Sequence, residues 1–120
     1  MDTHLKQIQI LIDSGKPFVS AILVDSKGST PRAQGGKILV TTSGLYSGTV
    51  GGGLIEAKSV KFAQDLLRET KPTEKTKFVE WNLNKDVGMS CGGSVKIFFE
   101  LYNLNTWEII IFGAGHVAQS

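Results

Sequence analysis

The sequence has one cysteine, no apolar run as long as a membrane span and no excess of charge of either sign. A single cysteine excludes an internal disulfide, which fits a reducing compartment, so we expect a cytoplasmic protein. Thirteen basic residues are interspersed with eleven acidic ones for a net charge of +2, and this balance argues against a nucleic-acid partner. The first twelve residues mix polar with apolar side chains, unlike a signal peptide, so we expect no membrane association.

Glycine is the residue type that stands out. The chain has 120 residues, which is enough for one domain, and its 41% hydrophobic and 20% charged residues are typical of a globular protein and exclude intrinsic disorder. Fourteen residues are glycine, and most of them lie in short clusters. These clusters separate segments whose apolar patterns predict helices and strands.

Two helices are predicted. The segment 3–14 places Leu5, Ile8 and Leu11 on one face, and Gly15 with Pro17 ends it. The segment 54–69 has apolar residues at helical spacing over four turns and predicts the longer helix.

Alternating or β-branched apolar residues predict strands over 18–25, 37–41, 45–50, 77–83, 94–102 and 107–112, with loops over 28–36 and 84–93. Helices and strands are mixed and hairpin connections dominate. The expected fold is therefore α+β, with a mixed β-sheet, one long and one short helix, and hairpin-connected strands.

The C-terminal segment predicts the start of a second domain. The strand over 107–112 leads into Gly113-Ala114-Gly115-His116-Val117-Ala118, a pattern that opens a dinucleotide-binding strand–turn–helix unit. The acidic residue that completes such a motif would follow Ser120, so Gly113 and Gly115 are candidates for an incomplete nucleotide-binding motif. We expect an N-terminal domain over 1–105 and the truncated start of a Rossmann-like domain over 106–120.

The first candidate loop is Gly28-Ser29-Thr30-Pro31-Arg32, closed by Gly35 and Gly36. Ser29 offers a hydroxyl, and Arg32 offers a guanidinium that grips a phosphate or carboxylate with two parallel hydrogen bonds. The alternative is a tight turn in which Arg32 pairs with a surface carboxylate.

The second candidate loop is Gly51-Gly52-Gly53, directly before the long helix. Three glycines allow positive φ angles and expose backbone N–H groups at the positive end of the helix dipole, where an anion fits. Close packing of helix on sheet needs fewer glycines, so we favour a ligand loop. Glu56, in the first helical turn, is either a capping residue or part of the ligand site. The spacing is not that of a P-loop.

The third candidate loop is Gly88-Met89-Ser90-Cys91-Gly92-Gly93. Cys91 is a candidate nucleophile or soft metal ligand, and the alternative is a small buried apolar side chain. His4 and His116 lie at opposite ends of the chain, so no Cys–His pair is indicated. The absence of a second cysteine excludes a structural zinc site in practice.

Three of these motifs together resemble the XdhC/CoxI family: GSTPR-x-x-G at 28–35, GTVGGG-x-x-E at 48–56 and GM-x-CGG at 88–93. The strand and GAGHVA at 107–118 are similar to the start of that family's Rossmann-like domain. Two positions depart from the usual pattern. Gly36-Lys37-Ile38 stands where A-x-M is expected, and Val50 stands where isoleucine is expected. Both changes are conservative in size.

The resemblance implies an accessory protein rather than an enzyme. Such a protein binds the molybdenum cofactor (molybdopterin) transiently, protects it, and delivers it to a molybdenum hydroxylase apoenzyme such as xanthine dehydrogenase. It implies cofactor contacts from Ser29, Arg32, Gly51, Gly52, Gly53, Glu56, Cys91, Gly92 and Gly93. The cofactor's phosphate would lie at the glycine loop and soft Cys91 near molybdenum. A cysteine desulfurase partner and a homodimer are further expectations, and NAD(P) binding is expected only in the domain that would follow.

Two other functions remain open at this stage. One is an NAD(P)-dependent oxidoreductase fragment with Cys91 as a reactive thiol, which predicts rapid alkylation of that thiol at neutral pH. The other is a non-catalytic dimerisation or interaction domain, which predicts a mass that depends on concentration and no affinity for small molecules.

Overall fold

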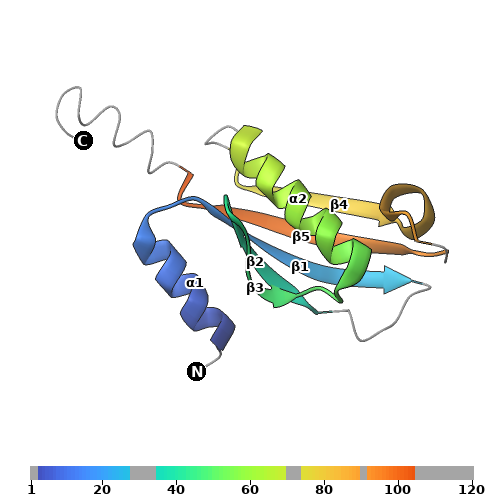
Figure 1. Cartoon of the computed structure of the whole chain (residues 1–120), viewed down its shortest axis with the longest axis horizontal. Coiled ribbons are helices and arrows are strands. Elements are labelled where there is room, and N and C mark those ends of the chain that lie inside the picture. Colours follow the sequence, from blue (N-terminus) through green and yellow to red (C-terminus); the bar gives the residue numbers. More distant parts are fainter. Residues whose placement is uncertain (1–2, 28–34, 70–73, 90–91, 105–120) are drawn as a thin grey trace.

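The computed structural model describes residues 3–27, 35–69, 74–89 and 92–104. The elements in chain order are α1 (Thr3–Ser14), β1 (Phe18–Lys27), β2 (Lys37–Thr41), β3 (Gly44–Thr49), α2 (Gly53–Glu69), β4 (Thr76–Asn82), the one-turn π-helix η2 (Leu83–Val87) and β5 (Ser94–Tyr102) (Figure 1). The α+β class and both predicted helices are confirmed. The strand predicted over 107–112, and Gly113 and Gly115 after it, lie outside the described residues.

The five strands form one sheet in the order β3-β2-β1-β5-β4, and all four pairings are antiparallel. The expectation of a mixed sheet is therefore wrong for the described strands. The helix α2 carries the chain from β3 to β4, which are the two edge strands of the sheet. These two strands run in the same direction but never pair, because three strands lie between them.

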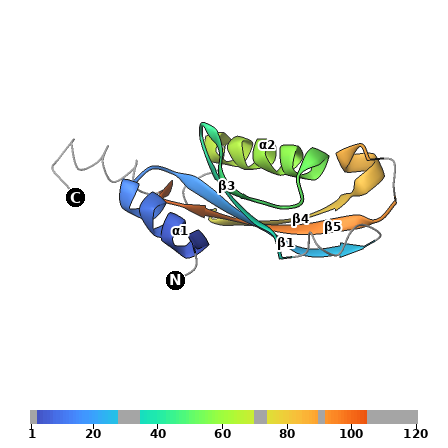
Figure 2. The same cartoon turned by 60° about the horizontal axis from the view of Figure 1, so that its bottom comes forward.

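The main core lies between α2 and one face of the sheet (Figure 2). Alternate residues of the central strands point to this face and are fully buried, among them Ala21, Ile97 and Phe99. From α2, the buried side chains are Ile55, Ser59 and Ala63, spaced every four residues along one stripe of the helix. This packing fixes the start of α2 over one end of the sheet.

The opposite face of the sheet is covered by α1 at one end only. Leu11 of α1 packs with Phe18 and Leu39, and the rings of Phe18 and Tyr102 stack with centroids 4.7 Å apart. The predicted apolar face of α1 is buried only in part, because Leu5 is 55% exposed. Phe78 on β4 is 56% exposed, so apolar surface remains open on this side of the sheet.

Candidate functional site

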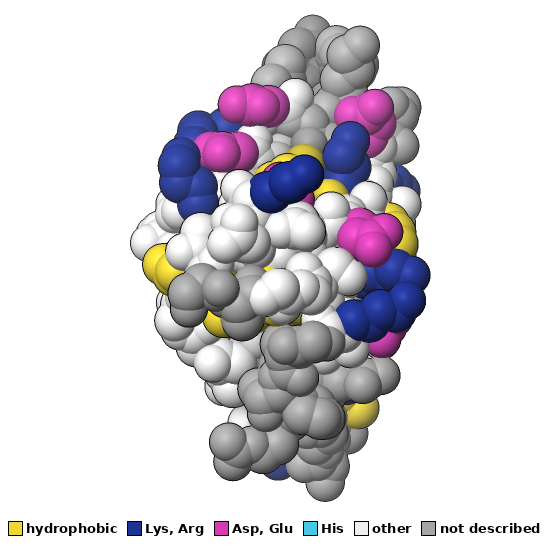
Figure 3. All heavy atoms as spheres, turned by 90° about the vertical axis from the view of Figure 1, so that its right-hand side faces the viewer, with side chains coloured by type: hydrophobic (Ala, Val, Ile, Leu, Met, Phe, Trp, Pro, Cys, Tyr) yellow, Lys and Arg dark blue, Asp and Glu magenta, His cyan; other side chains and the backbone are white. Residues whose placement is uncertain are grey.

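The strand ends to which the three glycine-rich loops attach lie at one end of the sheet (Figure 1). The register pairs the last residue of β1, Lys27, with the first of β5, Ser94, which also pairs with Asn82 at the end of β4. At the other sheet edge, Lys37 at the start of β2 pairs with Thr49 at the end of β3. The segments 28–36, 50–53 and 83–93 therefore all join strands at this end. In Figure 3, which looks onto it, the described atoms in the middle are uncharged, and charged side chains of both signs lie toward the upper and right-hand parts of the face.

The Gly51–Gly53 loop has a backbone that only glycine adopts readily. The three φ angles are 113°, 74° and 59°, all in the left-handed region, and Gly53 is the first residue of α2. A Cβ atom added at Gly52 or Gly53 would meet no described atom within 4 Å. The fold therefore needs these glycines for their conformation, and the space beside two of them is open.

Glu56 folds back onto this loop. Its Oε1 atom accepts hydrogen bonds from the Thr49 hydroxyl at 2.5 Å and from the N–H groups of Val50 and Gly52, each at 3.2 Å. The chain's own carboxylate thus occupies part of the anion-binding position that the sequence predicts, which supports the capping interpretation of Glu56. Thr49 was not among the predicted site residues, because no established helix-capping pattern places a hydroxyl seven residues before its carboxylate partner.

The third loop begins with η2, a short π-helix that starts at Leu83, the last residue of the predicted strand, and continues into the segment predicted to be a loop. Asn82 caps it, since its side-chain oxygen accepts hydrogen bonds from the N–H groups of Asn84 at 3.0 Å and Lys85 at 2.8 Å. The Asp86 carboxylate accepts a hydrogen bond from the N–H of Asn82 at 2.7 Å. Gly88 ends the turn with a left-handed φ of 88°. Asn82 and Asp86 were also missed, although an asparagine after a strand is a recognisable capping signal.

Both sides of the Cys91 segment are anchored to Leu83. The Met89 N–H donates to the carbonyl oxygen of Leu83, and the Leu83 N–H donates to that of Gly93, each at 2.9 Å. Gly92 is not in the left-handed region, and a Cβ atom there would meet no described atom within 4 Å. The described fold therefore gives no steric or conformational reason for glycine at position 92, so this position is open for another group to approach the backbone.

Three predicted site residues, Ser29, Arg32 and Cys91, lie outside the described residues. The first loop is nevertheless fixed at its closing end. The Gly35 N–H donates to the carbonyl oxygen of Leu23 at 2.8 Å, and the Leu23 N–H donates to that of Gly36 at 2.9 Å. The structure thus brings the attachment points of all three loops to one end of the sheet.

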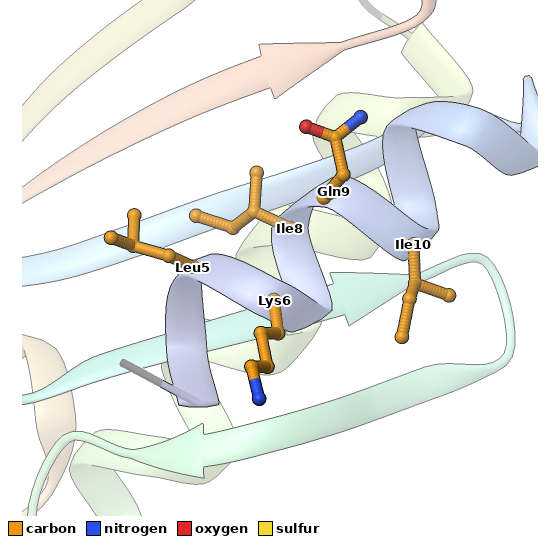
Figure 4. Close-up of a pocket in the computed structure, with 5 residues that line it drawn as sticks. All are labelled: Leu5, Lys6, Ile8, Gln9 and Ile10. Atoms are coloured by element: carbon orange, nitrogen blue, oxygen red, sulfur yellow. The ribbon is translucent and has the colours of Figure 1, made fainter. Parts of the chain in front are cut away.

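Two hollows of the described surface lie at the other end of the molecule. One of about 560 Å³ is lined by α1 residues, with Leu5 and Ile8 on one side of the helix and Ile10 on the other (Figure 4). Another, of about 710 Å³, is lined by residues that include Leu11, Thr42 and Leu67. Both are mainly apolar, and neither includes a predicted site residue.

Two further surveys cover the described residues alone. Within them, no group of three or more histidine, cysteine, aspartate or glutamate side chains is placed to hold a metal ion. None of their helices is long and apolar enough to cross a membrane.

Comparison with known proteins gives consistent matches. The model of the XdhC and CoxI family matches residues 11–79. The chain is 37% identical over 104 residues to the uncharacterized protein YqeB of Escherichia coli, covering 87% of the chain and 19% of YqeB. It is 30% identical over 99 residues to the molybdenum cofactor insertion chaperone PaoD of Escherichia coli, covering 80% of the chain and 31% of PaoD. The chain thus spans less than a third of either relative.

A solved structure has the same fold. A protein from Bacillus halodurans, described as a xanthine dehydrogenase, superposes with a TM-score of 0.62 over 95% of this chain and 36% of its own. Their sequences are 18% identical, so this likeness shows the fold alone.

Proposed function

The chain belongs to the XdhC and CoxI family, and from that premise we propose that it is an accessory protein of molybdenum enzymes rather than an enzyme itself. It binds the molybdenum cofactor transiently, protects it, and passes it to a molybdenum hydroxylase apoenzyme such as xanthine dehydrogenase. The similarity to the chaperone PaoD supports this function.

One observation carries the proposal: the three glycine-rich loops are attached at the same end of the sheet, and described glycines of two of them have open space beside their backbone. The space beside Gly52, Gly53 and Gly92 is clear of described atoms, so a flat ring system can approach the main chain closely. The molybdenum cofactor joins such a ring system, a pyranopterin, to a dithiolene and a terminal phosphate. The residues at this end of the sheet fit those groups.

Each part of the site has a role that follows from its chemistry. The first-turn N–H groups of α2 have no partner within the helix, and they face an anion with the positive end of the helix dipole behind them. Glu56 already holds the amides of Val50 and Gly52, so the cofactor's phosphate is assigned to the N–H groups that begin at Gly53. Arg32 and Ser29 supply a second anion contact, and Cys91, between its anchored neighbours, supplies a soft atom for molybdenum or its sulfur.

Release is part of the function of a carrier. The contacts proposed here are several polar ones from main chain and side chains, and each is weak by itself. Such a site can hold the cofactor away from water and still give it up to an enzyme that binds it more tightly. The bound cofactor supplies the molybdenum centre on which the recipient enzyme's redox chemistry depends.

The whole protein has further proposed partners. We propose a cysteine desulfurase as the source of sulfur, a homodimer as the assembly, a cytoplasmic location, and NAD(P) binding by a Rossmann-like domain whose first residues are 106–120. Gly113 and Gly115 would belong to that domain's nucleotide loop.

Cofactor retention tests the proposal. The purified chain is loaded with free molybdenum cofactor and desalted, and molybdenum and pterin on the protein are both quantified. We expect both to be retained in a fixed ratio. The Gly92→Ala variant should keep the wild-type melting temperature, since nothing described lies near its new methyl group, and yet retain less cofactor. Cys91→Ala tests the thiol in the same way.

Lys77→Gln is the matched control, because Lys77 is exposed near the start of β4, whereas the third loop follows the other end of that strand. It should retain cofactor like the wild type. Wild-type protein that holds neither molybdenum nor pterin would contradict the proposal, as would variants at 91 and 92 that bind as well as the control.

A further inference from the structure

We propose that Thr49 and Glu56 form a clasp that positions the glycine loop, and that Glu56 acts through this loop rather than by touching the cofactor. This inference rests on the proposed function for what the loop binds, but the clasp itself is defined by contacts within the chain. It changes the role of Glu56 from a ligand residue to a positioning residue and adds Thr49 to the site.

Two side chains satisfy three consecutive amides. Glu56 Oε1 accepts from the N–H groups of Val50 and Gly52, and Thr49 Oγ1 accepts from the N–H of Gly51 at 3.1 Å. The Thr49 hydroxyl then donates to Glu56 Oε1 at 2.5 Å, which joins the two acceptors into one network. The clasp therefore spans the turn from the last residue of β3 into the first turn of α2.

The loop needs such a restraint. Glycine loses more backbone entropy on ordering than any other residue. Because three adjacent glycines are ordered here in the left-handed region, the free-energy cost of ordering the loop is the sum of three such losses. Added Cβ atoms at Gly52 and Gly53 would find open space, so packing around these two residues does not hold the loop. Hydrogen bonds to an ionised acceptor are about twice as strong as neutral ones, and Glu56 provides three of them.

The same contacts make Glu56 a poor ligand for an anion. A carboxylate already at the loop repels a phosphate, and its Oε1 atom is committed to three donors. By holding amides 50 to 52, the clasp leaves the next N–H groups, at the start of α2, as the ones available to a ligand. The loop is thus set in its binding shape before the cofactor arrives, which lowers the entropy lost on binding.

Amide hydrogen exchange in the cofactor-free chain measures the clasp directly. Glu56→Ala and Thr49→Val each remove an acceptor, so we expect the amides of residues 50 to 52 to exchange roughly tenfold faster. Glu56→Gln and Thr49→Ser keep an oxygen in place and should restore most of the protection. Thr76→Val, on the exposed edge strand β4, is the matched control and should leave these amides unchanged.

Cofactor retention by the same variants separates positioning from direct contact. The clasp predicts that retention falls in Glu56→Ala and Thr49→Val together and returns in Glu56→Gln and Thr49→Ser, in step with the exchange rates. Loss of retention in both Glu56 variants with wild-type exchange at 50 to 52 would make Glu56 a ligand and overturn the inference. Unchanged exchange in Glu56→Ala would overturn it as well. If the wild type retains no cofactor, the proposed function fails, and the exchange rates alone still decide whether the clasp exists.

Discussion

At the scale of single residues, glycine serves different purposes at different positions of this chain. Gly48 and Gly88 have nearly the same left-handed φ, 90° and 88°, but different surroundings. A Cβ atom at Gly48 would lie 2.0 Å from the backbone oxygen of Lys37, whereas one at Gly88 would meet nothing described within 4 Å. Gly48 is therefore required by close contact between β3 and β2, and Gly88 by its conformation alone.

Alanine substitutions at Gly48 and Gly88 give a matched pair of stability predictions. Gly88→Ala should lower the free energy of unfolding by about 1 kcal/mol, the cost of a left-handed alanine. Gly48→Ala should lower it by about 3 kcal/mol, because the methyl group also forces two paired strands apart. Urea unfolding of both variants measures the difference. If both variants lose the same free energy of unfolding, β2 and β3 move apart to admit the methyl group without a further loss of stability.

Tyr102 is a described residue whose ionisation differs between the folded and the unfolded chain. Burial, and then the hydrogen bond and negative charge of Glu100, raise the pKa of the Tyr102 phenol to about 12. Between the ordinary value of 10 and this value, the folded chain keeps a proton that the unfolded chain has lost. The free energy of unfolding should therefore fall as the pH rises through this window.

Alkaline unfolding tests this expectation. Tyr102→Phe removes the ionisable group and should flatten the decline in stability above pH 10, while Glu100→Gln should move tyrosinate formation to lower pH. The phenol absorbance reports the titration. If the stability of Tyr102→Phe falls above pH 10 as steeply as that of the wild type, other ionisable groups cause the fall.

At the scale of elements, α1 is tied to the rest of the fold by a residue near the other end of the described chain. The Asn103 side-chain amide donates to the carbonyl oxygens of Leu11 at 3.1 Å, Ile12 at 3.4 Å and Lys16 at 3.0 Å. Asn103 also has a left-handed φ of 65°, which asparagine tolerates better than most residues. It thus adds a donor to the carbonyl groups of Leu11 and Ile12, which also accept from the Ser14 hydroxyl and the Gly15 N–H, and it binds the carbonyl of Lys16 just after the helix.

Substitution of Asn103 separates these two contributions. Asn103→Gly keeps the backbone conformation and loses the amide, so it should lower the free energy of unfolding by about 1–2 kcal/mol. Asn103→Ala adds the left-handed strain and should cost about 1 kcal/mol more. Denaturant unfolding gives both values, and faster exchange of α1 amides locates the effect. Wild-type stability in Asn103→Gly would mean that packing on Leu11 alone holds α1.

The elements themselves were largely predictable. The bounds of α1, β2 and β5 agree with the predicted segments, and those of α2, β3 and β4 differ by one residue at one or both ends. These segments have a clear apolar period or a clear glycine boundary. The π-helix η2 was not predicted, since its stability comes from the side chains of Asn82 and Asp86 rather than from an apolar pattern.

At the scale of the whole molecule, the described surface has two different ends. One carries the attachment points of the glycine-rich loops and the start of α2, and the other carries α1, the β2–β3 turn and the two apolar hollows described above. If the proposed site is correct, a ligand at the first end should leave the second end unchanged. Binding at one end can then be told apart from nonspecific adsorption to apolar surface.

Bound cofactor should therefore protect one end selectively. Molybdenum cofactor at about 100 times its dissociation constant should stabilise the fold by about 2.7 kcal/mol and raise the melting temperature. Amides at the start of α2 and around 88–93 should exchange more slowly, and those of α1 should not change. Protection centred on α1 would place the binding site at the apolar hollows instead.

The sequence by itself determined the helices α1 and α2, the described strands, the positions of the glycine-rich loops and the family resemblance, because apolar period, turn residues and motif spacing are local properties of the chain. Only the tertiary structure decided that the sheet is antiparallel throughout, since strand order depends on which edges α2 connects. It also showed which groups Glu56 contacts, because its carboxylate reaches the N–H of Val50 only once the left-handed glycines turn the chain back. Contacts such as that of Asn103 with Leu11 join residues far apart in sequence, so no local pattern encodes them.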